Sequence, residues 1–183
     1  MRGRRLLLLA PCSAVLLLSG HGAAADWPQW RGVNRDARSA EAGLLQSWPA
    51  GGPPLSFKAS GLGGGFSSVA VVGERIYTLG DLSDAQYALA LARKDGAILW
   101  KSKVGPTWKD EYLGPRSTPT VDGDRVYVLG TEGDLYCLEA ATGKTVWTKN
   151  LVQDFGGQMM KVEGSEWKFS ESPLVDGDRV IVT

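Results

Sequence analysis

The chain has 183 residues, of which 20 are basic and 20 are acidic, so its formal net charge at pH 7 is zero. This balance gives no electrostatic reason to expect nucleic acid or an anionic membrane surface as a partner. With a single histidine, His21, and two cysteines, Cys12 and Cys137, the chain has little material for a histidine-based nucleophile, a zinc site or a disulfide framework.

Residues 1–25 have the composition of a secretory signal peptide. Three arginines open the chain, an apolar run covers 6–18, and the small residues "HGAAA" precede Asp26. The run is too short for a transmembrane helix, so we predict cleavage and a periplasmic or secreted mature chain without a transmembrane segment. Cleavage leaves 17 basic and 20 acidic residues and removes His21 together with Cys12. Attachment of a lipid at Cys12 is the alternative.

The rest of the chain contains an internal repeat. The stretches "SSVAVVGERIYTLG" (67–80), "STPTVDGDRVYVLG" (117–130) and "ESPLVDGDRVIVT" (171–183) each predict two alternating strands joined by a turn at a glycine. A second block, at 90–101 and again at 137–148, predicts two more strands in each unit. Four antiparallel strands in a repeat of about 50 residues are typical of a β-propeller blade. The fold class is therefore predicted to be all-β.

The hexapeptide "VDGDRV" occurs at 121–126 and again at 175–180. An Asp-x-Asp pair supplies too few oxygens for calcium, which takes six or more. An Asp-Gly step between alternating segments is instead a strong hairpin signal, because glycine adopts the positive φ that the turn needs. The first unit has Val72 in place of the first aspartate, which also favours a turn. We predict two structural turns and no metal site.

A glycine followed four residues later by a tryptophan marks the last turn of each unit. Gly96 and Trp100 in the first unit correspond to Gly143 and Trp147 in the second, 47 residues later. Thr142 precedes the second glycine. A tight turn with a large aromatic side chain close behind it suits packing of one blade against the next. We predict that these residues dock adjacent blades and do not bind a ligand.

The stretches "CLEAATGKTVW" and "ALARKDGAILW" resemble the tryptophan-docking repeat of the pyrroloquinoline-quinone-like (PQQ-like) β-propellers. The segment "DWPQWRGVNRDA" is similar to the N-terminus of secreted bacterial members. That family includes quinoprotein alcohol dehydrogenases and the non-catalytic propeller of outer-membrane assembly. The resemblance implies four-stranded antiparallel blades with tryptophan-docking turns over nearly all of residues 26–183.

We predict three parts: the signal peptide at 1–25, an N-terminal extension at 26–60, and a partial propeller at 61–183. Phe57 stands where the repeat would place a docking tryptophan, so the extension is expected to contribute an outer strand that closes the ring. The partial propeller holds about two full blades and the start of a third. Because a ring takes at least four blades, a longer protein is expected.

The long connections before the inner strands are the candidate binding loops, because loops on a rigid scaffold commonly carry function. Their candidate binding residues are Trp108, Tyr112, Arg116, Ser117, Trp167 and Glu171. The alternative is that these loops are solvated connections with aromatic side chains packed beneath them. The glycine-rich "GLGGGFSS" at 61–68 lacks the Lys-Ser/Thr and helix of a phosphate loop, so we interpret it as a flexible entry to the first inner strand.

We predict an exported, non-catalytic module that binds a partner through these loops. The partner is an unidentified protein or small molecule, and no cofactor or catalytic residue is evident. The alternative is part of a quinoprotein oxidoreductase. Resemblance to those enzymes implies PQQ with calcium, a catalytic aspartate and commonly a vicinal cysteine pair, and under this alternative the catalytic residues lie after residue 183.

Overall fold

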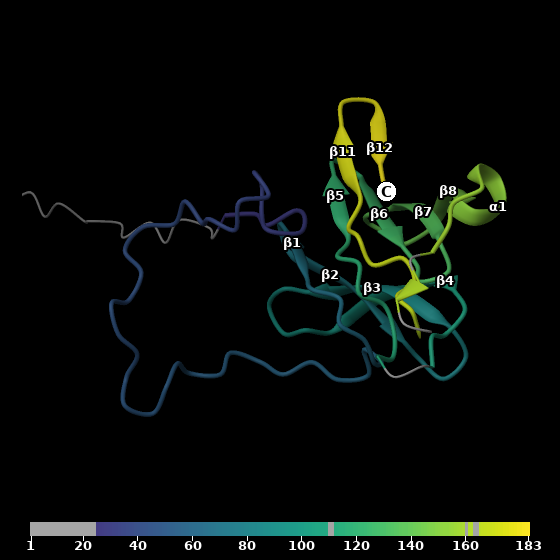
Figure 1. Ribbon diagram of the computed structural model, residues 1–183. Coiled ribbons are helices and arrows are strands. Elements are labelled where there is room, and N and C mark those ends of the chain that lie inside the picture. Colours follow the sequence, from purple (N-terminus) through teal and green to yellow (C-terminus); the bar gives the residue numbers. More distant parts are fainter. Residues whose placement is uncertain (1–24, 110–111, 160, 163–164) are drawn as a thin grey trace, which may run out of the picture.

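Figure 1 shows the computed structural model, which describes residues 25–109, 112–159, 161–162 and 165–183. The predicted signal peptide, except for Ala25, lies outside the described residues. Within them, almost all regular structure is β-strand, with one five-residue helix, α1 (Leu151–Phe155). No helix among the described residues is long and apolar enough to cross a membrane.

Two four-stranded antiparallel sheets form the centre of the structure. Blade 1 has the order β1-β2-β3-β4, with bounds Ala70–Val72, Arg75–Asp81, Gln86–Ala92 and Ile98–Gly105. Blade 2 has the order β5-β6-β7-β8, with bounds Thr120–Asp122, Arg125–Leu129, Asp134–Glu139 and Thr145–Asn150. The prediction of four-stranded antiparallel blades is confirmed, and the described part of the ring is open (Figure 1).

A third unit is represented by one hairpin, β11 (Leu174–Asp176) and β12 (Arg179–Ile181). A small separate hairpin, β9 (Lys161–Val162) with β10 (Ser165–Glu166), lies in the preceding connection. Strand β5 lies beside both β1 and β11, so the first strands of the three units are neighbours. These three strands are called the inner strands below.

The turn after each inner strand is a two-residue hairpin loop. In "VDGDRV" Asp122 pairs with Arg125, which leaves Gly123 and Asp124 as the central residues. Among these two, only the glycine has a positive φ, 54°, which matches a type II′ turn. Gly73 and Gly177 occupy the same place with φ of 53° and 59°. The aspartates are exposed, as expected for a structural turn.

The main core lies between blades 1 and 2. Alanine and valine side chains from both sheets form most of it, including the buried Val104 and Val126. Tyr77 and Leu138 are larger side chains in the same core. In β7 the burial alternates along most of the strand, because successive side chains point to opposite faces of a sheet. This packing holds the two blades together and positions the loops at their ends.

Trp100 lies across the β7–β8 turn of the next blade. Its Nε1 donates to the Ala140 carbonyl at 3.1 Å, and Ser102 Oγ donates to the Gly143 carbonyl at 2.5 Å. A Cβ at Gly143 would be only 2.5 Å from the Trp100 ring, so no residue with a side chain fits there without a shift. Trp147 has the same position in blade 2 but borders an open groove of about 750 Å³ instead of a turn glycine.

The N-terminal extension contains no strand among the residues described between 26 and 60. Phe57 has no strand assignment, so the predicted outer strand is not tested by the described residues. The Phe57 ring nevertheless covers Gly96, where an added Cβ would be 2.8 Å away. This contact resembles that of Trp100 with Gly143, and closure of the ring by this segment stays a prediction.

Candidate binding site on the loop face

The strand connections of each blade lie at two opposite ends, because the strands run antiparallel. One end, called the turn face, carries the turns after the inner strands and the β3–β4 and β7–β8 turns. The other end, called the loop face, carries the β2–β3 and β6–β7 connections and the long segments between blades. The loop face includes the described parts of 106–119 and 151–173. All six candidate binding residues belong to this face.

Three aromatic side chains from separate segments meet on the loop face. Tyr112 stacks on Trp167 with ring centroids 6.0 Å apart and planes at 15°, and Phe66 meets Tyr112 edge-on at 6.4 Å. Their exposed fractions are 63% for Phe66, 49% for Tyr112 and 46% for Trp167. We call these three residues the aromatic platform. It presents apolar surface to solvent although its rings contact one another.

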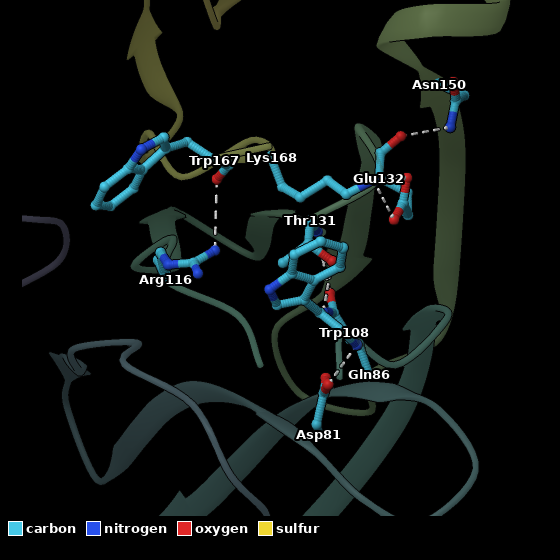
Figure 2. Close-up of polar contacts among 9 residues, drawn as sticks. All are labelled: Asp81, Gln86, Trp108, Arg116, Thr131, Glu132, Asn150, Trp167 and Lys168. Atoms are coloured by element: carbon cyan, nitrogen blue, oxygen red, sulfur yellow. Dashed lines mark hydrogen bonds and ion pairs between the residues drawn. The ribbon is translucent and has the colours of Figure 1, made fainter. Parts of the chain in front are cut away.

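Arg116 links the backbones of two residues of the aromatic platform. Its Nη2 donates to the Tyr112 carbonyl at 2.8 Å and its Nη1 donates to the Trp167 carbonyl at 3.5 Å. One guanidinium therefore joins the two connections that carry the stacked rings. Figure 2 shows the bond to Trp167. The fork of donors on arginine suits this task, because it reaches two acceptors in one plane.

The glycine-rich stretch also supports the aromatic platform. Gly64 exchanges two backbone hydrogen bonds with Asp81, at 2.9 and 2.8 Å, and the Phe66 N–H donates to the Pro115 carbonyl at 2.7 Å. A Cβ on Gly114 would lie 2.4 Å from the Gly64 carbonyl oxygen. The expected flexible entry is therefore held by close packing, because a Cβ on Gly65 would also lie 2.9 Å from the Pro115 ring.

Trp108 lies apart from the aromatic platform, in a polar cluster between blades 1 and 2 (Figure 2). Its backbone N–H donates to Asp81 Oδ2 at 2.7 Å, and Lys168 Nζ lies 4.7 Å from the centroid of its ring. Lys168 also pairs with Glu132 at 3.0 Å, and its side chain is only 9% exposed. The carboxylate of Glu132 and the face of the Trp108 ring stabilise the charged ammonium group of this buried lysine.

The Asp81 carboxyl has a raised pKa in this cluster. Burial is the main cause, since it disfavours the charged form. The Trp108 N–H, the Gln86 amide and the charge of Lys109 act in the opposite direction without cancelling the effect. Gln86 itself is fully buried and joins blade 1 to blade 2, donating from Nε2 to Thr131 Oγ1 at 2.7 Å and accepting from the Thr131 N–H at 3.1 Å.

Ser117 and Glu171 lie just before successive inner strands. Ser117 is fully buried, and its carbonyl accepts from Ser67 Oγ at 2.7 Å. Glu171 is half-buried, and its Oε2 accepts from the Ser170 N–H at 3.2 Å. Ser117 Oγ and Glu171 Oε1 are buried without a hydrogen-bond partner among the described residues. On the loop face, Ser117 is therefore closed off from solvent and Glu171 is only partly accessible to a partner.

The structure brings Tyr112, Arg116 and Trp167 together, while Trp108 joins a different cluster. Sequence reasoning did not select Phe66 for the surface, or Lys168 and Gln86 for the joint between the blades. Phe66 and Lys168 come from connections without periodicity, and Gln86 opens strand β3 but bonds to a residue 45 positions away, so no local spacing connects these residues with their contacts. Phe66 directly precedes the repeated stretch at 67–80, as Arg116 directly precedes the one at 117–130, and this correspondence is a signal that could have found it.

Among the described residues, no group of three or more histidine, cysteine, aspartate or glutamate side chains is arranged to hold a metal ion. Cys137 is a buried free cysteine, and burial raises the pKa of its thiol. The alternative with PQQ and calcium is not tested by these observations, because its residues were expected after position 183.

A family model described as outer membrane protein assembly factor BamB matches residues 84–183, more than half of the chain. The chain belongs to this family. The BamB of Aliivibrio fischeri (strain ATCC 700601 / ES114) is 34% identical over 73 residues, which are 38% of this chain and 19% of that protein. The resemblance to the PQQ-like propellers is thereby confirmed. The chain spans about a fifth of the length of this BamB relative.

The chain is similar to parts of solved structures. The quinohemoprotein alcohol dehydrogenase from Comamonas testosteroni matches with a TM-score of 0.58 and 20% identity, over 85% of this chain and 22% of that one. The crystal structure of BamB from Moraxella catarrhalis matches with a TM-score of 0.48 and 16% identity, over 67% of this chain and 35% of that one. At 20% identity the dehydrogenase likeness shows the propeller fold and nothing of its chemistry.

Proposed function

We propose that this BamB-family chain is part of an exported, non-catalytic propeller that binds another protein through its loop face. The observation that carries the proposal is the aromatic platform, whose rings are at once exposed and held in place. Aromatic side chains with both apolar and polar parts are enriched in protein interfaces, and tryptophan and tyrosine supply much of the binding energy there. By its name, the Aliivibrio relative acts in the assembly of outer-membrane proteins, and we propose the same role here.

The preorganisation of the aromatic platform supports this role. Arg116 bonds to both supporting carbonyls, and the Gly64–Asp81 and Phe66–Pro115 backbone bonds fix the neighbouring segment. A rigid platform loses little conformational freedom on association, which leaves more of the contact energy for affinity. A merely solvated loop would not need this degree of support.

The test replaces Tyr112 and Trp167 together by alanine in the protein as its own cell exports it. The variant should fold, because both rings are half exposed, but it should lose most of its ability to restore the level of folded outer-membrane proteins in cells lacking the gene. The matched control is Trp48→Ala, which removes a tryptophan that is 66% exposed in the N-terminal extension. The control should behave as the unaltered protein.

Full activity of the double variant would contradict the proposed binding face. A separate assay addresses the alternative: the purified protein is titrated with PQQ and calcium and tested for dye-linked alcohol oxidation. Saturable binding with turnover would show that the protein is a quinoprotein oxidoreductase. No turnover, together with the loss of assembly in the double variant, supports a binding module.

A further inference from the structure

Residues 26–37 lie along the free edges of the inner strands. The backbones of Trp27 and Val71 exchange two hydrogen bonds, at 2.7 and 2.8 Å. One residue further, the Pro28 carbonyl accepts from the Val121 N–H at 2.8 Å. Val71 and Val121 are the middle residues of β1 and β5, so they hold equivalent positions in the repeat. The segment thus passes from blade 1 to blade 2 and contacts the equivalent residue of each inner strand.

Arg35 extends the contact to the third unit. Its Nη2 donates to the Ser172 carbonyl at 3.1 Å and its Nη1 donates to the Pro173 carbonyl at 3.2 Å. Both carbonyls directly precede β11, the third inner strand. The same guanidinium donates to Gln29 Oε1 at 3.3 Å, which ties it back to its own segment. One short stretch therefore contacts three consecutive units, and its partners are up to 138 residues away in the sequence.

The segment has a constrained shape of its own. Gly32 has a φ of 80°, and an added Cβ there would lie 2.8 Å from the Trp27 ring. Arg31, Arg35 and Ala37 have positive φ of 64°, 55° and 61°, which L-residues rarely adopt. Such conformations cost energy and persist where surrounding contacts hold them. The contacts with the inner strands supply that support.

The chemistry of the segment suits the edge that it covers. An inner strand pairs on one side only, and its free edge is a template for pairing with a further strand. Trp27 satisfies both backbone groups of Val71, whereas Pro28 lacks an N–H and offers only its carbonyl. The segment therefore covers the edge without continuing a sheet beyond itself. Asp26 completes the contact, since its Oδ1 accepts from the Gly73 N–H at 2.9 Å.

We propose that residues 26–37 are an internal strap, and that the inner edges of blades 1 and 2 with the carbonyls before β11 form a binding site for a peptide that is extended at its first residues and turned after them. The ligand of this site is a peptide with a Trp-Pro pair, then a turn at a glycine, then an arginine. In this chain Trp27, Pro28, Gly32 and Arg35 supply these features. The strap holds the three units in one order and keeps their inner edges from pairing with other strands. This inference is independent of the proposed partner-binding function of the loop face.

The first test compares two glycine variants in the protein as it is exported. Gly32→Ala places a methyl group against the Trp27 ring, whereas Gly43→Ala, at a similar φ of 73°, meets nothing within 4 Å. Hydrogen exchange is measured at the Val71 and Val121 amides. We expect at least about tenfold faster exchange at both in Gly32→Ala, and unchanged exchange in Gly43→Ala. The Leu89 amide in β3, a strand that is paired on both sides, is the internal reference and should not change.

The second test supplies the strap in trans. Residues 26–37 are deleted, and a synthetic peptide of residues 25–38 is added to the purified protein. The peptide should restore slow exchange at Val71 and Val121, and the same peptide with Gly32→Ala should not. Equal restoration by both peptides, or equally fast exchange at the two amides in the unaltered protein and in Gly32→Ala, would overturn the proposal.

Discussion

Blades 1 and 2 are joined at both faces, but by different physical means. At the turn face the joint is close packing, with Trp100 lying on Gly143 of the next blade. At the loop face the joint is polar, with Gln86 of blade 1 bonded to Thr131 of blade 2 and Asp81 bonded to Trp108 in the connection between the blades. The packing joint depends on shape, and the tyrosine–tryptophan pair beside it recurs in both blades. The polar joint depends on individual partners, so it is where one blade differs from the next.

The residues around the two joints show this difference. In both blades a tyrosine meets the docking tryptophan with centroids 6.0 Å apart and planes at 49°, for Tyr77 with Trp100 and for Tyr127 with Trp147. At the loop face, by contrast, Asp81 of blade 1 corresponds in the repeat to Thr131 of blade 2. The two blades therefore share the aromatic packing at the turn face but differ in the polar residue at the loop face.

The largest expected effect is at the packing joint. Gly143→Ala puts a Cβ 2.5 Å from the Trp100 ring at a φ of 73°. Overpacking and backbone strain together should lower the free energy of unfolding by about 3–4 kcal/mol. Gly123→Ala is the matched control, because its φ is 54° and nothing lies within 4 Å, so only the strain of about 1–2 kcal/mol applies. Denaturant unfolding measures both, and equal losses would show that the Trp100 contact does not join the blades.

An intermediate effect is expected at the polar joint. Gln86→Met keeps the length of the side chain but leaves the Thr131 hydroxyl and N–H without their partner in a buried place. The loss should be about 2–3 kcal/mol, the cost of unsatisfied buried polar groups. Gln46→Met, which changes an exposed glutamine, should cost less than about 0.5 kcal/mol. Similar losses for the two variants in denaturant unfolding would contradict a buried polar joint.

The smallest effect concerns the Asp81 carboxyl. Its raised pKa means that the folded state favours the protonated form more than the unfolded state does. The carboxyl therefore lowers stability as the pH rises above its usual pKa of 3.8 and through the raised value, and this cost is absent below 3.8. Asp81→Asn keeps an oxygen acceptor for the Trp108 N–H and should be slightly more stable than the unaltered protein near pH 7.

The advantage of Asp81→Asn should disappear in unfolding measurements below the usual pKa of 3.8. Asp84→Asn, on the β2–β3 connection that follows Asp81, removes an exposed charge that pairs with Lys103 at 3.8 Å and accepts from Tyr87, and it shows the effect of losing a charge at this end of the blade. An Asp81→Asn variant that is less stable at neutral pH would show that the carboxylate charge is needed by the cluster.

Prediction from the sequence succeeded where the chain repeats itself. The blades, the turns at Gly73, Gly123 and Gly177 and the position of Trp100 in the repeat follow from local spacing, because a hairpin and its glycine are neighbours in the chain. The contacts of Phe66, Arg116 and Lys168 could not be predicted in this way. Their partners lie on other segments, and no periodicity connects them.

By itself, the sequence determined which residues form strands and turns, since alternation and positive φ are local properties of the backbone. It also placed Trp100 and Trp147 in equivalent positions, because each stands four residues after a turn glycine. Only the tertiary structure decided which exposed aromatic rings form one platform, which polar side chains join two blades, and that residues 26–37 contact three consecutive units. These features depend on backbone edges and carbonyls from distant segments, and such groups become neighbours only when the blades pack.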